Sequence, residues 1–192
     1  MNQPRHFVLG LIITVTSMQA AFASAVVTVQ PGPLGVGQIF TADIDISGVT
    51  DLYAFQFDVS FAPQVIAATA VTEGNFLSLG GGTFFFPGTV NNSAGTISFI
   101  ADSLLGPGSG VSGSGVLAHV MFHGVGQGMS PISLSNLEFL DSTLSPIVVS
   151  AVAGTSPTIA PEPSSLAFLV CGLMLLGCRL LKRMECVSAR SR

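Results

Sequence analysis

The sequence predicts an all-β fold, an antiparallel β-sandwich of jelly-roll type with about nine strands, followed by one transmembrane helix near the C-terminus. Three observations predict this architecture. Apolar and polar residues alternate with a period of two through most of residues 26–152. Clusters of Gly, Pro, Asn and Ser separate the alternating stretches. The longest apolar runs lie near the two ends of the 192-residue chain, outside the alternating region.

The clearest strand signal covers residues 53–61, where aromatic and branched residues alternate with small or polar ones. Residues 40–47 show the same pattern, so each segment has one buried and one solvated face. A change of face near Asn136 predicts a β-bulge or a bent strand. A Gly/Ser-rich loop is expected between Gly106 and Gly115. Further strands are expected at residues 26–30, 64–73, 83–92, 95–102, 115–123, 131–140 and 146–152.

The N-terminus has the pattern of a signal peptide, which we place at residues 1–23. Arg5 precedes a short apolar run over residues 7–15, which is too short to span a bilayer as a stable anchor. Ala21 and Ala23 are the small residues that signal peptidase requires before the cleavage site. The mature chain is therefore expected to begin at Ser24.

The charge of the central region is one-sided, because residues 24–160 contain no Lys or Arg. Nucleic acid is excluded as a partner, since phosphate backbones are bound through clustered cations. Cationic partners, neutral sugars and, if the acids cluster, Ca²⁺ remain candidate ligands. No other cofactor is expected. The acidic residues of this region are Asp43, Asp45, Asp51, Asp58, Glu73, Asp102, Glu138 and Asp141.

Candidate catalytic and metal-binding groups are few. Asp43 and Asp45 share one strand face about 6.5–7 Å apart, a spacing that suits paired glycosidase carboxylates, but nothing nearby in sequence separates their pKa values. His119 and His123 lie about 13 Å apart on an extended strand, too far to ligate one metal ion. The three cysteines all follow residue 170, so none serves the central region as a nucleophile or a disulfide. We therefore expect no enzymatic activity.

Several of the predicted strands resemble one family, the cohesin domain of bacterial cell-surface and cellulosome scaffolds. Residues 52–63 resemble its third strand, which ends in an aromatic-x-Pro corner at Phe61-Ala62-Pro63. The resemblance covers residues 26–153, and we place the domain at residues 24–155. The other matching stretches are 26–29, 37–40, 65–66, 72–74, 97–102 and 115–122.

The resemblance implies a protein-binding face, because cohesins meet dockerin partners through the sheet of strands 3, 5, 6 and 8. The family's polar pair on strand 3 falls on Ala54 and Gln56, so half of it is lost and a conventional dockerin is expected to bind poorly. We expect the outward positions to form a partly apolar patch for another partner. These positions are Gln56, Asp58, Ile100 and Asp102.

The C-terminal region resembles the PEP-CTERM sorting signal of Gram-negative bacteria that make extracellular polysaccharide. A Pro-rich linker at 156–163 contains Pro161, Glu162 and Pro163, and a transmembrane sorting helix is expected at 164–183. A basic cluster closes this helix, and residues 184–192 form a cytoplasmic tail that is longer than usual for the family. The resemblance implies cleavage by exosortase near the PEP motif. The cluster consists of Arg179, Lys182 and Arg183.

Two functions follow from these observations. One is an exported cell-surface or extracellular-matrix protein whose cohesin-like module binds a protein partner or a carbohydrate. The other is a structural component of a biofilm or exopolysaccharide matrix without a discrete ligand. In both, signal peptidase and exosortase process the chain. The protein is held in the inner membrane at least transiently and then reaches the cell surface or matrix.

Overall fold

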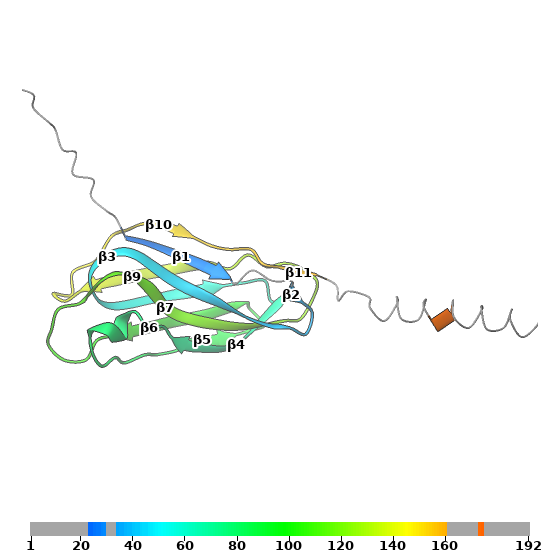
Figure 1. Ribbon diagram of the computed structural model, residues 1–192, viewed down its shortest axis with the longest axis horizontal. Coiled ribbons are helices and arrows are strands. Elements are labelled where there is room, and N and C mark those ends of the chain that lie inside the picture. Colours follow the sequence, from blue (N-terminus) through cyan, green and yellow to red (C-terminus); the bar gives the residue numbers. More distant parts are fainter. Residues whose placement is uncertain (1–22, 30–33, 161–172, 175–192) are drawn as a thin grey trace, which may run out of the picture.

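A computed structural model describes residues 23–29, 34–160 and 173–174, and its main body is built almost entirely of β-strands (Figure 1). A single 3₁₀ turn, η1 (Leu77–Gly80), interrupts them in this part of the chain. The strands are β1 (Ala23–Val29), β2 (Leu34–Gly35), β3 (Ile39–Ser60), β4 (Ile66–Glu73), β5 (Thr89–Asn91), β6 (Thr96–Ser103), β7 (Val111–Gly124), β8 (Gly128–Met129), β9 (Ser133–Asp141), β10 (Val149–Ala153) and β11 (Thr158–Ala160).

The 22-residue strand β3 belongs to both layers of the sandwich. Its first half pairs with β1 and β7, and this layer continues to β10 and β4. Its second half pairs with β6 and β9, and β5 extends this layer beyond β6. The strand changes layer across residues 47–51, where Gly48 (φ 65°) and Asp51 (φ 59°) take left-handed conformations and the register with β7 shifts.

The hydrophobic core lies between the two halves of β3 and the strands beside them. Phe57, Phe76 and Phe122 are among its largest fully buried side chains. The Phe122 ring packs edge-on against Phe61 and stacks on Phe40, with centroid distances of 5.2 and 5.7 Å. Truncating such a residue to Ala typically costs about 3–5 kcal/mol. This apolar contact stabilises a domain that has no disulfide among its described residues.

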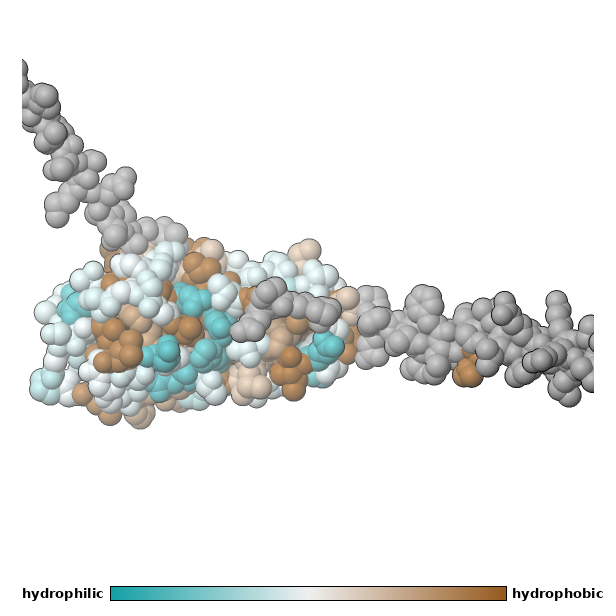
Figure 2. Space-filling model, viewed as in Figure 1, coloured by the Kyte–Doolittle hydropathy of each residue, from teal (hydrophilic) through white to brown (hydrophobic). Residues whose placement is uncertain are grey.

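Hydrophobic residues are also present on the surface. On the side shown in Figure 2 they gather near the end of the domain that carries η1, beside a band of hydrophilic residues. Leu79, in η1 itself, is 74% exposed. Exposed hydrophobic residues also lie elsewhere on the domain, among them Ile39 and Met129, which are 62% and 60% exposed.

The predicted sandwich is confirmed, with differences in individual strands. The expected strands at 40–47 and 53–61 are one continuous strand, β3. The expected strand at 83–92 is wrong in extent, because only residues 89–91 form a strand after Pro87 and Gly88, which is at φ 79°. Parallel pairing joins β1 to β10 and β2 to β11, whereas the other pairings are antiparallel. The expected bulge near Asn136 is present.

The Gly/Ser stretch predicted as a loop is also corrected. Its second half belongs to β7, which begins at Val111. Hydroxyl groups fix this part to the crossing of β3, since Ser112 and Ser114 accept hydrogen bonds from the backbone N–H groups of Asp51 and Gly48 at 2.9 and 3.1 Å. Side-chain to backbone bonds of this kind compensate for the irregular register.

Most of the predicted sorting segments lie outside the described residues. These are Ala21 and the rest of the signal peptide before Ala23, the PEP motif, and the predicted helix at 164–183 apart from residues 173–174. Within the described ranges no helix has the length and hydropathy needed to cross a membrane. Ala23, the predicted cleavage residue, is buried as the first residue of β1.

Candidate functional site

A hollow of about 440 Å³ lies on the outer face of the layer formed by β9, the second half of β3 and β6. Its exposed lining is mainly apolar, which is unusual for a strand face in contact with water. We call this surface the aromatic face and define it by Ala54, Gln56, Phe84, Phe86, Phe99, Ala101, Ser103, Glu138 and Leu140, all of which line the hollow.

One wall of the hollow is residues 82–86, which we call the aromatic arm. The backbone N–H groups of Phe84 and Phe86 donate to the carbonyl groups of Ser103 and Ala101 at 2.8 and 2.7 Å. The arm therefore runs beside β6 as an extended segment, and its side chains alternate. Phe85 packs against the core, whereas Phe84 and Phe86 are 65% and 41% exposed.

Phe99 is the third exposed phenylalanine of the aromatic face, and a bulge in β6 brings it there. Its φ is 61°, a left-handed conformation that is rare for a bulky residue. The bulge shifts the β3–β6 register between Phe57 and Val59, so that Phe99 turns outward and is 53% exposed. Its ring meets that of Phe86 at 5.9 Å with an angle of 64° between the planes.

Asp58, a predicted partner-binding residue, fixes the bulges on both sides of β3. Its Oδ1 accepts a hydrogen bond from the backbone N–H of Phe99 at 2.7 Å, and its Oδ2 accepts one from Nδ2 of Asn136 at 2.6 Å. Asn136 also has a positive φ, 51°, at the bulge of β9. Both oxygens of Asp58 are thus engaged within the protein, and the residue positions the aromatic face.

The other three predicted partner-binding residues divide between the two sides of the layer. Gln56 lines the hollow as expected. The outward placement of Ile100 and Asp102 is wrong, because these residues are 0% and 3% exposed. The bulge at Phe99 is the physical reason, since one extra residue in β6 reverses every later side chain. The outward positions of β6 are Phe99, Ala101 and Ser103.

Asp102 lies in an environment that is unusual for a carboxylate. Its side chain turns into the sandwich, where Glu73 of β4 in the opposite layer is its charged neighbour. Burial, followed by the charge of Glu73, raises the pKa of Asp102 to about 7. The residue is therefore part of the interior behind the aromatic face, and it is also one of the residues that line the hollow.

Sequence reasoning missed the three phenylalanines that expose the most aromatic surface. A signal was present in the run Thr83-Phe84-Phe85-Phe86-Pro87, which has glycines on both sides. Three adjacent Phe residues cannot all enter one core from an extended segment, because successive side chains point to opposite faces. At least one had to face outward, and the structure places two of them there.

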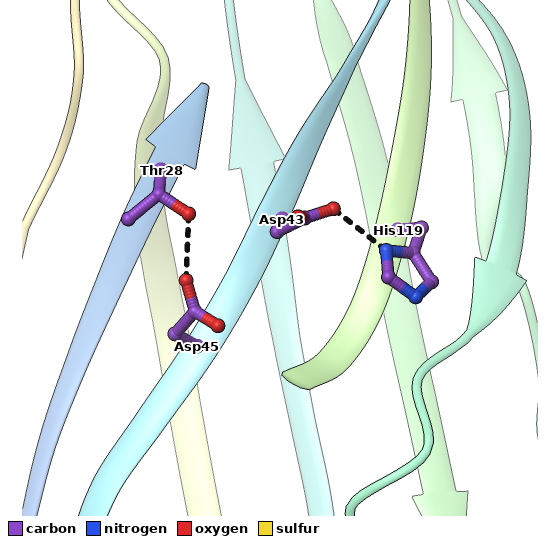
Figure 3. A network of polar contacts seen from close by, with 4 residues as sticks. All are labelled: Thr28, Asp43, Asp45 and His119. Carbon is purple, nitrogen blue, oxygen red and sulfur yellow. Dashed lines mark hydrogen bonds and ion pairs between the residues drawn. The ribbon is translucent and has the colours of Figure 1, made fainter. Parts of the chain in front are cut away.

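The polar groups on the first half of β3 are arranged differently (Figure 3). Asp43 contacts His119 across the neighbouring strand, with 2.6 Å between Oδ1 and Nδ1, and Asp45 accepts a hydrogen bond from the Thr28 hydroxyl at 2.7 Å. The two carboxylates thus have separate partners on opposite sides of β3 and do not form a pair. No group of three His, Cys, Asp or Glu residues within the described ranges is arranged to hold a metal ion.

Comparison with known proteins gives one family. The model of the cohesin domain matches residues 22–156 of this chain, a range that contains the aromatic face and all of the buried core except Ile159. No curated protein matches the chain.

Solved structures show the same fold. A chain from a type II cohesin–X-dockerin complex of Acetivibrio cellulolyticus, an N-terminal interface mutant, is similar with a TM-score of 0.59 and 15% identity, over 73% of this chain and 99% of that one. A non-cellulosomal cohesin from Archaeoglobus fulgidus is similar with a TM-score of 0.58 and 14% identity, over 77% of this chain and 96% of that one. The cohesin module of a Clostridium perfringens family 33 glycoside hydrolase has a TM-score of 0.57 and 14% identity, over 73% of this chain and 99% of that one.

Proposed function

The chain belongs to the cohesin-domain family, and on that basis we propose that its β-sandwich binds a protein partner through the aromatic face. One observation carries the proposal: three exposed phenylalanines surround an apolar hollow of about 440 Å³ on one sheet face. Aromatic side chains of this kind dominate the binding energy of protein interfaces. The hollow would receive an apolar side chain of the partner.

The edge of the aromatic face supports a partner with cationic groups. Glu138 and Gln56 border the hollow, and the region 24–160 contributes carboxylates without a single Lys or Arg. Complementary charge at the rim mainly raises the association rate and excludes wrong partners. We therefore expect a segment with apolar residues at its centre and Lys or Arg at its margin.

Dockerins are one candidate class of partner, because the similar Acetivibrio cellulolyticus structure is a cohesin–X-dockerin complex. The face of this chain differs from the one that the family resemblance implies. Ala54 stands where that resemblance implies a polar residue, and Asp102 is buried. We propose a partner that relies on apolar contacts more than a conventional dockerin does.

A carbohydrate ligand is the second candidate, and the ring geometry disfavours it. Sugar rings stack on flat aromatic surfaces, whereas the planes of Phe86 and Phe99 are 64° apart. The lining also offers few polar groups beside Gln56, Ser103 and Glu138 for sugar hydroxyls. A structural matrix role without a discrete ligand is the alternative that remains if neither class binds.

We further propose that the domain reaches the cell surface through the two terminal signals. The support lies in the sequence: the apolar run before Ala21 and Ala23, and the PEP motif followed by an apolar segment and a basic cluster. Signal peptidase would remove residues 1–23. Exosortase would cut near Pro163, after transient anchoring of the chain in the inner membrane.

Affinity capture with the full chain tests the binding proposal. The chain is immobilised in detergent micelles and exposed to secreted proteins and exopolysaccharide of the source organism. We expect Phe84→Ser/Phe86→Ser to weaken capture of the specific protein about 100-fold or more. The matched control is Thr28→Ala/His119→Ala on the other layer, which should bind as the wild type does. Equal capture by both variants, or retention of polysaccharide alone, contradicts the proposal.

Intact-mass measurement of surface material tests the sorting proposal. Processing predicts a chain that begins at Ser24 and ends near Pro163. Replacing Pro161 and Pro163 by Ala should leave the C-terminal segment attached. Recovery of wild-type chains that all retain residues 166–182 would show a permanent anchor instead.

A further inference from the structure

The aromatic arm is tied to the opposite layer of the sandwich through one carboxylate. The Thr83 hydroxyl donates a hydrogen bond of 2.6 Å to Oε1 of Glu73, which ends β4. Thr83 directly precedes the exposed Phe84, and it also forms an isolated bridge to Leu104. Glu73 therefore holds Thr83, the second residue of the arm, from behind.

Asp102 approaches the same carboxylate from β6. Its Oδ1 accepts a hydrogen bond from the backbone N–H of Ser103 at 2.9 Å. Its Oδ2 is buried and has no hydrogen-bond partner within the described ranges. The neighbouring Glu73 carboxylate contributes to the raised pKa of Asp102, through its charge and as a side-chain hydrogen-bonding neighbour. Two ionised carboxylates are both acceptors, so this contact needs a proton.

No other group supplies that charge balance. The region 24–160 contains no Lys or Arg. His119 of β7 and Glu73 line a second hollow, separate from the one at the aromatic face, but the Nδ1 of His119 is engaged with Asp43 of β3. The carboxylates of Asp58 and Glu138 belong to the outer side of the layer. A proton shared by the two acids is the remaining way to satisfy Asp102 Oδ2.

We propose that Asp102 and Glu73 share one proton behind the aromatic face, and that this proton fastens the aromatic arm to the opposite layer. The inference rests on the proposed function for its consequence, which is that partner binding depends on pH. When the proton leaves, the buried Asp102 becomes negatively charged beside the partly buried Glu73, and Glu73 can reorient away from Asp102 and from Thr83. The arm then loses the bond that holds its second residue, Thr83.

The direction of the pH effect follows from the environment of Asp102. Its pKa is raised from the value of an unfolded chain to about 7. The folded state therefore holds more protons than the unfolded state between about pH 4 and pH 7, and its stability falls as pH rises through this range. The arm should be fastened in mildly acidic surroundings and loosened above about pH 7–8.

Titration and hydrogen exchange on the full chain in detergent micelles test the inference without any partner. We expect the ¹³C signal of the Asp102 carboxyl group to titrate near pH 7. Protection of the Phe84 and Phe86 amides, corrected for base-catalysed exchange, should fall about tenfold or more over the same range. These measurements use no binding partner, so their outcome is independent of whether the proposed function is correct.

Two variants complete the test. Asp102→Asn supplies an N–H donor to Glu73 at every pH, and Glu73→Gln supplies one to Asp102 while still accepting from Thr83. Both should keep Phe84 and Phe86 protected above pH 7, whereas the matched control Asp45→Asn should behave as the wild type does. If Asp102→Asn fails to fold, the Glu73→Gln variant and the wild-type titration still test whether the proton holds the arm. The inference is overturned if the Asp102 signal titrates near pH 4. It is also overturned if the protection of the Phe84 and Phe86 amides does not change over the pH range in which Asp102 titrates.

Discussion

The two halves of β3 hold their outward carboxylates in different ways. In the first half, Asp43 and Asp45 interact with side chains of the neighbouring strands, His119 and Thr28 (Figure 3). These are partly exposed groups whose hydrogen bonds join side chains only. The register with β7 shifts between Ile44 and Asp45, but neither of these two bonds reaches the backbone there. Contacts of this kind contribute little to stability, because water competes for every group involved.

In the second half, Asp58 accepts its hydrogen bonds at two points where the backbone is irregular. It bonds the main chain at Phe99 and the side chain of Asn136, and both of these residues have positive φ. Bulges leave ladder groups without strand partners, and a carboxylate can satisfy them. Aspartate thus makes only side-chain contacts on the first half of β3, whereas on the second half it holds the bulges in place.

The difference separates a solvated face from the face that we propose binds a partner. On the first half, polar groups are paired with one another, whereas on the second half a polar group is used to bring Phe99 to the surface. A left-handed Phe is strained by about 1–3 kcal/mol, so the bulge opposes folding unless other contacts offset it. Strain that exposes an apolar ring is typical of a functional surface.

The largest effect should follow from removing the carboxylate that fixes both bulges. We expect Asp58→Ala to lower the free energy of unfolding by about 2–3 kcal/mol, because two short hydrogen bonds to a charged group are lost. Partner binding should weaken as well, since Phe99 is no longer held outward. Calorimetry measures the loss of stability, and affinity for the captured partner measures the loss of binding.

The matched control for this prediction is Asp45→Ala, which removes one bond between side chains from the first half of β3. It should change stability by less than about 1 kcal/mol and leave binding unaffected. Equal losses in the two variants would mean that the bulges are held by the core rather than by Asp58.

The sequence predicted the sandwich and the strand faces because their signal is local. Residues 53–61 alternate so regularly that the inward side is unambiguous. Gln56 was placed correctly for this reason. The aromatic face depended on the bulge at Phe99, whose register is fixed by Asp58, 41 positions earlier in the chain. Periodicity carries no information on such a bond, so Ile100 and Asp102 were assigned to the wrong side.

A smaller effect is expected from salt, because carboxylates without Lys or Arg repel one another. Hydrogen bonds from Ser142 and Gly110 lower the pKa of Asp51, and the charge of Asp141 partly opposes this shift. Screening acts within about 10 Å at 0.1 M ionic strength, so the melting temperature should rise by about 2–5 °C from low to moderate salt. A melting temperature that does not change with salt would mean that the acids are too far apart to interact.

The smallest effect should come from the contact between Asp43 and His119, although its 2.6 Å separation is among the shortest in the domain. The two side chains are 24% and 36% exposed, so solvent screens their attraction and ordering them costs entropy. Asp43→Ala also removes one negative charge from a region that has no Lys or Arg, which relieves repulsion and offsets the lost bond. We expect a change in unfolding free energy below about 0.5 kcal/mol and unchanged partner affinity. A double-mutant cycle with His119→Ala measures the pair directly. A coupling energy above about 1.5 kcal/mol would show that the first half of β3 also depends on its carboxylates, and the contrast between the two halves would then fail.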